Sequence, residues 1–189
     1  MKKITVAFLL SAAATAPAFA ADNGFYAGVT LGQSKTDNIA TNTTMTKDTD
    51  TVYGILAGYQ FNKYLAVEAQ YTGAGKYTAT IPAGNNYSGK ADAFSVTAVG
   101  ILPVNDSFDF YGKLGFANVK TTLSAVPATA DTGATRNAAT IGLGAQYNVT
   151  PAVGIRLGWD RYGAAVTTAS GATNHFNVNE YSLGAVYKF

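Results

Sequence analysis

The feature that most constrains this chain is a two-residue alternation of apolar and other side chains that recurs in eight segments. In the final stretch, EYSLGAVYKF (180–189), the odd-numbered positions, one parity of the segment, are Tyr181, Leu183, Ala185, Tyr187 and Phe189. Successive side chains of a β-strand point to opposite faces, so this pattern predicts a strand with two unlike faces. No segment has a sustained helical period. The expected strands are 24–33, 51–61, 64–73, 92–102, 108–119, 138–147, 152–162 and 180–189.

The connections between these segments alternate in length. Those at 61–64, 103–107 and 148–151 are short and rich in Asn, Asp and Pro, which favour tight turns. Those at 34–50, 74–91, 120–137 and 163–179 are long and polar. This alternation predicts an all-β fold, an eight-stranded antiparallel up-and-down transmembrane β-barrel of an outer membrane. In such barrels the short turns face the periplasm and the long loops face outside. The first and last strands must then pair, because hydrocarbon tolerates no open sheet edge.

A soluble up-and-down barrel would use the same pattern with its apolar face turned inward around a ligand. Only 13% of the residues are charged, and the polar face is mostly Gly, Ala, Ser and Thr, which suits a solvent-facing surface poorly. Aromatic residues also gather near both ends of the apolar face, as in the interfacial girdles of membrane barrels. The outer row is Tyr53, Tyr71, Phe94, Phe116, Trp159 and Tyr181, and the inner row is Phe25, Tyr59, Phe110, Tyr147, Tyr187 and Phe189. These features favour the membrane barrel.

The first twenty residues have the pattern of a secretory signal peptide. Lys2 and Lys3 precede an apolar run over 4–14, and Ala18-Phe19-Ala20 is a small-x-small cleavage site. We expect residues 1–20 to be removed and 21–189 to form one barrel domain in the outer membrane, although a retained N-terminal anchor is the alternative. Residues 21–189 carry 11 basic and 11 acidic residues, so a nucleic-acid partner is not expected. The chain has no cysteine and therefore no disulfide.

Three segments resemble the transmembrane domain of the outer membrane protein A family and its small relatives. They are GYQFNKYLAVEAQY (58–71), LPVNDSFDFYGKLG (102–115) and YNVTPAVGIRLGW (147–159). The end SLGAVYKF resembles the C-terminal signal that the barrel assembly machinery reads. That resemblance assigns the signal to Ser182, Gly184, Tyr187 and Phe189. It also implies outer-membrane lipid and lipopolysaccharide as surroundings, with host, phage or cell-surface ligands at the loops. We expect a monomer.

Three charged residues are expected inside the barrel. Glu68, Lys113 and Arg156 each follow a short turn by about five residues, so they should lie at similar height. Glu68 and Arg156 come from opposite walls, and the interior of eight strands is narrow enough for them to meet. The family resemblance matches this pair to a lumenal gate whose switch partners are a Glu and a Lys; Gln146 and Val99 occupy those positions here. The pair is therefore either a static plug or a gate.

No catalytic, cofactor or metal site is predicted. His175 is the only histidine, falls in the last predicted loop, and has no nucleophile or carboxylate beside it. The sequence thus predicts a non-enzymatic outer-membrane barrel with a structural and surface-interaction role. The alternative is a narrow channel for ions or very small solutes, gated by the lumenal charges.

Overall fold

The computed structural model describes residues 23–36, 45–47, 49–80, 86–126, 132–167 and 173–189. Its regular elements are β1 (Gly24–Thr36), β2 (Met45–Lys47), β3 (Thr49–Asn62), β4 (Leu65–Thr80), β5 (Asn86–Asn105), β6 (Phe108–Val126), β7 (Thr132–Asn148), β8 (Val153–Thr167) and β9 (Thr173–Lys188). Across these ranges the search for a helix long and apolar enough to span a membrane finds none. The predicted signal peptide, 1–20, lies outside the described residues.

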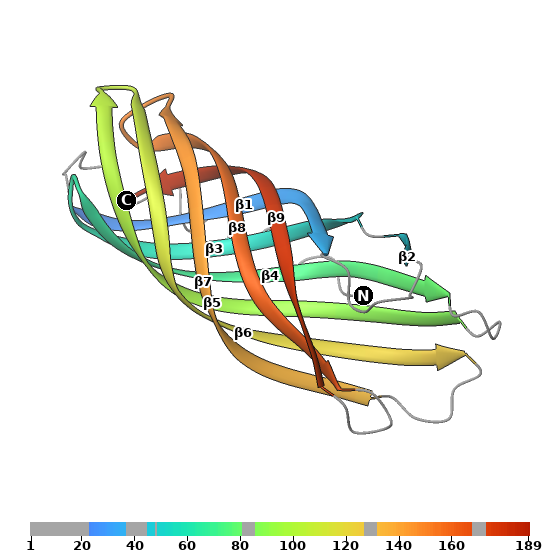
Figure 1. Cartoon of the computed structure of the whole chain (residues 1–189). Coiled ribbons are helices and arrows are strands. Elements are labelled where there is room, and N and C mark those ends of the chain that lie inside the picture. Colours follow the sequence, from blue (N-terminus) through green and yellow to red (C-terminus); the bar gives the residue numbers. More distant parts are fainter. Residues whose placement is uncertain (1–22, 37–44, 48, 81–85, 127–131, 168–172) are drawn as a thin grey trace, which may run out of the picture.

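Eight long strands close into an antiparallel barrel, which confirms the predicted fold class (Figure 1). Neighbours along the chain pair with one another, and the short β2 adds only a brief ladder to β4. The circle closes where β1 pairs with β9, in a register that sets Tyr26 opposite Lys188 and Thr36 opposite Val178. The amide of Phe189 extends this ladder by donating to the carbonyl oxygen of Phe25 at 2.9 Å. The predicted pairing of the first and last strands is therefore confirmed.

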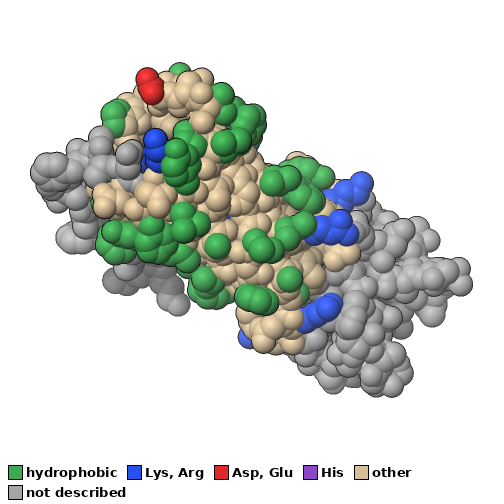
Figure 2. All heavy atoms as spheres, turned by 60° about the vertical axis from the view of Figure 1, so that its left-hand side comes forward, with side chains coloured by type: hydrophobic (Ala, Val, Ile, Leu, Met, Phe, Trp, Pro, Cys, Tyr) green, Lys and Arg blue, Asp and Glu red, His purple; other side chains and the backbone are tan. Residues whose placement is uncertain are grey.

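The apolar parity of each strand points outward. Phe116 is 75% exposed and Leu31 is 62% exposed, whereas Val52 and Thr140, on the opposite parity, are buried. Hydrophobic side chains spread over the outer surface in the space-filling view (Figure 2). A ligand-carrying soluble barrel would bury this face, so that alternative is wrong. An exposed apolar belt is the surface that lipid covers.

The three short connections are tight turns, as their Asn, Asp and Pro content predicts, although a threonine caps the third. The side-chain oxygen of Asn62 accepts from the amides of Tyr64 and Leu65, at 2.8 and 3.0 Å. Asn105 accepts from Ser107 at 2.9 Å, and the Thr150 hydroxyl accepts from Val153 at 2.9 Å. Each turn thus replaces ladder hydrogen bonds with side-chain ones, which is why these residue types favour tight turns.

The predicted strands end too early at the other end of the barrel, and the predicted long loops are correspondingly too long. Of the segment 74–91, residues 74–80 and 86–91 belong to β4 and β5; of 120–137, residues 120–126 and 132–137 belong to β6 and β7. In these stretches polar residues and isolated apolar ones such as Leu123 and Val126 occur on both parities, so the apolar alternation that marks a membrane strand is lost. The backbone pairing nevertheless continues, because Thr and Tyr favour extended chain. Figure 1 shows these hairpins running on past the end of β1.

Candidate functional site

The carboxylate of Glu68 lies at the centre of the barrel interior. Glu68 projects from β4 and is 1% exposed, and Arg156 reaches it from β8 on the far wall. The Nη1 atom of Arg156 donates to Glu68 Oε2 at 2.5 Å. The structure therefore joins the two residues in a buried ion pair across the lumen.

Lys113 on β6 is the second cation at this carboxylate. Its Nζ lies 2.8 Å from Glu68 Oε1, an ion-pair contact without hydrogen-bond geometry, and donates to Gln70 Oε1 at 3.2 Å. It also lies 3.7 Å from Asp160 Oδ1. The sequence places Lys113 at the height of Glu68 but does not reveal this contact, because the side-chain direction across the lumen depends on the barrel's closure.

Gln146 holds the side of the guanidinium that faces away from Glu68. Its Oε1 accepts from Arg156 Nε at 3.1 Å and from Nη2 at 2.9 Å. Its Nε2 donates to Asn148, whose own amide donates to Asp109 at 2.8 Å. The resemblance matches this position to an acidic switch partner, so here a neutral amide already occupies the alternative partner's place. Val99, at the other switch position, is buried and apolar.

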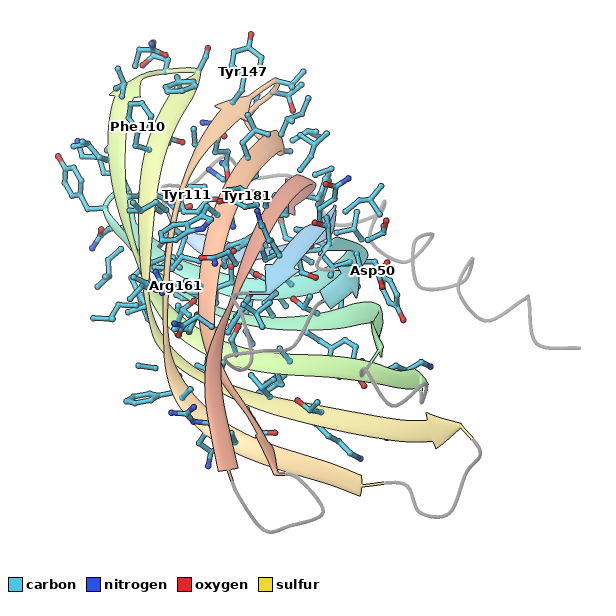
Figure 3. The ribbon with its side chains drawn as sticks, turned by 45° about the vertical axis from the view of Figure 1, so that its right-hand side comes forward. Asp50, Phe110, Tyr111, Tyr147, Arg161 and Tyr181 are labelled. Atoms are coloured by element: carbon cyan, nitrogen blue, oxygen red, sulfur yellow. The ribbon has the colours of Figure 1, made fainter. Side chains whose placement is uncertain are left out.

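Two tyrosine rings enclose the guanidinium. The Cζ atom of Arg156 lies 4.7 Å from the ring centroid of Tyr111 and 5.6 Å from that of Tyr26. The Tyr26 hydroxyl donates to Glu68 Oε2 at 3.0 Å, and the Tyr111 hydroxyl donates to the carbonyl oxygen of Leu157 at 2.9 Å. Tyr111 is buried whereas Phe110, the residue before it in β6, is exposed; both are labelled in Figure 3. Tyr111 was not among the residues predicted to lie inside, although its parity with Lys113 marks it as inward.

Glycines directly opposite in the adjacent strands make room for these rings, since Gly58 pairs with Tyr26 and Gly144 pairs with Tyr111. A Cβ at Gly58 would overlap the Tyr26 ring, and one at Gly144 would overlap the Tyr111 ring. The lumenal glycines, which have no side chain, therefore leave space for large side chains from neighbouring strands.

A second acidic layer lies further from the short turns. Asp160 on β8 and Glu180 on β9 are directly opposite each other in the ladder, and both are buried. Among the described residues, Glu180 Oε1 has no hydrogen-bond partner. The described buried charges are three carboxylates, Glu68, Asp160 and Glu180, and two cations, Lys113 and Arg156.

The network leaves little free volume directly beside the guanidinium of Arg156. The cavity there, lined in part by Tyr26, Tyr111 and Gln146, is about 20 Å³. A volume of this size accommodates about one water molecule.

The other predicted site residues lie in β9. Ser182 and Gly184 are opposite Gly32 and Thr30 of β1, and the rings of Tyr187 and Phe189 meet edge to face at 5.1 Å. These positions fit a barrel seam but do not test recognition by the assembly machinery. His175 was predicted to lie in a loop, and that is wrong: its backbone belongs to β9, opposite Ala165. Within the described ranges, no three His, Cys, Asp or Glu residues cluster to hold a metal ion.

A closed antiparallel barrel with an apolar exterior and a charged, buried interior defines an integral outer-membrane β-barrel protein. The chain belongs to the outer membrane protein beta-barrel domain family, whose model matches residues 6–189. The comparison with curated protein sequences finds no match.

Several solved structures share the fold at low sequence identity. Neisserial surface protein A is 18% identical with a TM-score of 0.66, covering 88% of this chain and 97% of its own. The outer membrane protein OprG of Pseudomonas aeruginosa is 17% identical with a TM-score of 0.55, covering 89% and 96%. The attachment invasion locus protein Ail of Yersinia pestis, solved with the heparin analogue sucrose octasulfate, is 17% identical with a TM-score of 0.54, covering 88% and 97%. These similarities establish the fold, and the family to which the chain belongs places it in the outer membrane.

Proposed function

We propose that this protein is a non-enzymatic, plugged outer-membrane barrel with a structural and surface-interaction role. The observation that carries the proposal is the layer of Glu68, Lys113 and Arg156, in which one carboxylate binds two cations across the lumen. A lumen crossed by such a layer favours the role of a scaffold that presents its extracellular connections, and not that of a pore. Similar folds include a surface protein and an attachment protein, which supports the same class of role.

The proposal includes the route to the membrane. Residues 1–20 direct secretion and are cleaved after Ala20, and residues 21–189 form the barrel domain. Ser182, Gly184, Tyr187 and Phe189 are then read by the barrel assembly machinery. The partners are outer-membrane lipid and lipopolysaccharide around the belt and host, phage or cell-surface ligands at the extracellular connections, bound by a monomer.

A gated channel for ions or very small solutes is the second candidate. The observation that favours it is that Arg156 already contacts a second acceptor, Gln146, to which it could transfer fully if it released Glu68. Since Gln146 is neutral, that transfer would leave Glu68 with Lys113 alone. Desolvated charges are costly without a partner, so the plug is the better-supported state.

Single-channel recording in planar bilayers separates the two candidates. A static plug predicts a silent wild type and small, steady currents in Arg156→Ala, because the truncation removes the guanidinium that crosses the lumen. Arg161→Ala is the matched control, since Arg161 has the outward parity of β8. Discrete openings of the wild type, altered in frequency by Arg156→Ala, would instead establish the gate.

A further inference from the structure

The outer surface of the barrel has a shallow apolar groove of about 710 Å³ across β7, β8, β9 and β1. The row of the groove nearer the short turns follows the ladder from Ala145 through Leu157 and Leu183 to Leu31, each directly opposite the next. Ala145 is the small member of this row, flanked by Phe110 on β6 and Leu157 on β8. A small residue between larger ones leaves a depression in a surface that faces lipid.

The row of the groove that lies farther from the short turns is the aromatic girdle. Leu143 is opposite Trp159, Trp159 is opposite Tyr181, and Tyr181 is opposite Gln33. Trp and Tyr rings at this position mark the depth where the hydrocarbon meets the polar head groups. The groove therefore ends at the membrane interface on the side away from the short turns.

Two cations lie in the next lipid-facing row, one step farther from the short turns than the girdle. Arg161 is opposite Asn179, and Asn179 is opposite Lys35. One outward step along a strand is about 6.8 Å, and two strands span about 10 Å, so the three polar groups form a compact row above Trp159 and Tyr181. Figure 3 shows Arg161 further than Tyr181 from the end that carries Tyr147. The flanking members of this row, Ile141 and Thr49, are uncharged.

We propose that this surface binds one phosphorylated, multiply acylated glycolipid of the outer leaflet, the chemistry of lipid A. An acyl chain lies in the groove, and a sugar phosphate accepts hydrogen bonds from Arg161, Asn179 and Lys35. The apolar groove and the cationic row match the two halves of this molecule at the correct spacing along the membrane normal. The orientation comes from the proposed function, in which the end away from the short turns faces outside.

A second copy of the chain fits this surface less well. In a symmetric dimer about the membrane normal, the same patch meets itself at the same depth. Arg161 and Lys35 would then face Arg161 and Lys35 of the other copy across the apolar contact. The charge of the row thus favours an anionic amphiphile.

The test is native mass spectrometry of the folded barrel in detergent, titrated with diphosphoryl hexa-acyl lipid A or with phosphatidylglycerol. We expect a one-to-one lipid A adduct with about tenfold tighter binding than phosphatidylglycerol. The double variant Lys35→Gln/Arg161→Gln should lose about tenfold for lipid A, and Ala145→Phe should weaken both lipids by filling the groove. Lys63→Gln, which removes an exposed cation near the opposite end, is the control and should bind like wild type.

Two results would overturn the proposal. One is phosphatidylglycerol binding as tight as lipid A binding, with the same dependence on Lys35 and Arg161. The other is a dimer in wild type that Ala145→Phe abolishes, which would assign the groove to a second copy. Bilayer conductance of the same variants reports separately on the plugged lumen, so failure of the lipid site and failure of the proposed function are distinguishable.

Discussion

Glu68 organises the interior at the scale of single residues, because its carboxylate forms ion pairs with both lumenal cations. An ionised side chain that is buried alone costs several kcal/mol, and removing one member of a buried pair leaves that cost uncompensated. The tyrosine hydroxyl from β1 and the amides of Gln70 and Gln146 complete the coordination of these charges. The layer therefore behaves as one unit whose members depend on each other.

Arg156→Ala should destabilise the barrel by about 3 kcal/mol, since Glu68 then keeps only Lys113. The double variant Glu68→Gln/Arg156→Gln removes both charges and should recover part of the loss. Urea unfolding in lipid vesicles measures both changes. A single variant as stable as wild type would show that the pair contributes nothing to folding.

Gly144→Ala should cost about 1–3 kcal/mol, because the added methyl group overlaps both the carbonyl oxygen of Leu157 and the Tyr111 ring that lies over Arg156. Gly100→Ala is the matched control: a Cβ there meets its nearest atom, a backbone oxygen, only at 4.0 Å. The same urea midpoints compare the two variants. Equal midpoints would mean that the Tyr111 ring moves aside without loss.

At the scale of elements, the barrel seam depends on β9 and its last residues. Phe189 extends the β1–β9 ladder through its amide and packs its ring on Tyr187. The lumenal parity of β9 places Gly184 against the backbone of β1, where a Cβ would meet the carbonyl oxygen of Val29. The strand thus combines close backbone contact on one face with an aromatic end on the other.

Deletion of Phe189 should block assembly after secretion, leaving unfolded chain in the periplasm that proteases degrade. Phe61→Ser removes another exposed aromatic, which packs on Tyr59, and should leave assembly intact. Heat-modifiable mobility on gels reports the folded barrel in each strain. Wild-type amounts of folded barrel without Phe189 would refute its role as an assembly signal.

The whole molecule is held by a continuous antiparallel ladder that has no open edge among its eight long strands. All eight present apolar residues outward, and the charged layer fixes the interior at one height. The short turns gather at one end of the barrel and the polar hairpin extensions at the other (Figure 1). This difference between the two ends gives the orientation that we predict in the membrane.

Cysteine labelling tests that orientation, since the chain has no native cysteine. Ala83→Cys lies in the connection between β4 and β5, and Asp106→Cys lies in the short turn between β5 and β6. A membrane-impermeant maleimide added to intact cells should label position 83 and spare position 106 until the outer membrane is opened. The reverse order of labelling would invert the topology.

The sequence alone determined the number of long strands, their antiparallel order, the outward face of each and the seam between the first and the last. Alternation with period two, read together with turn residues such as Asn62 and Asn105, specifies these features locally. It could not determine where β4 to β9 end beyond the membrane, because those stretches lack a regular apolar alternation. Nor could it reveal that Lys113 joins Glu68, that Gln146 holds Arg156, or that Tyr111 covers the guanidinium. Lys113 and Glu68, like Tyr111 and Arg156, come from strands that are not neighbours in the ladder, so only the closure of the barrel brings them together. Gln146 and Arg156 are directly opposite in the β7–β8 ladder, but alternation does not show how their side chains extend across the lumen.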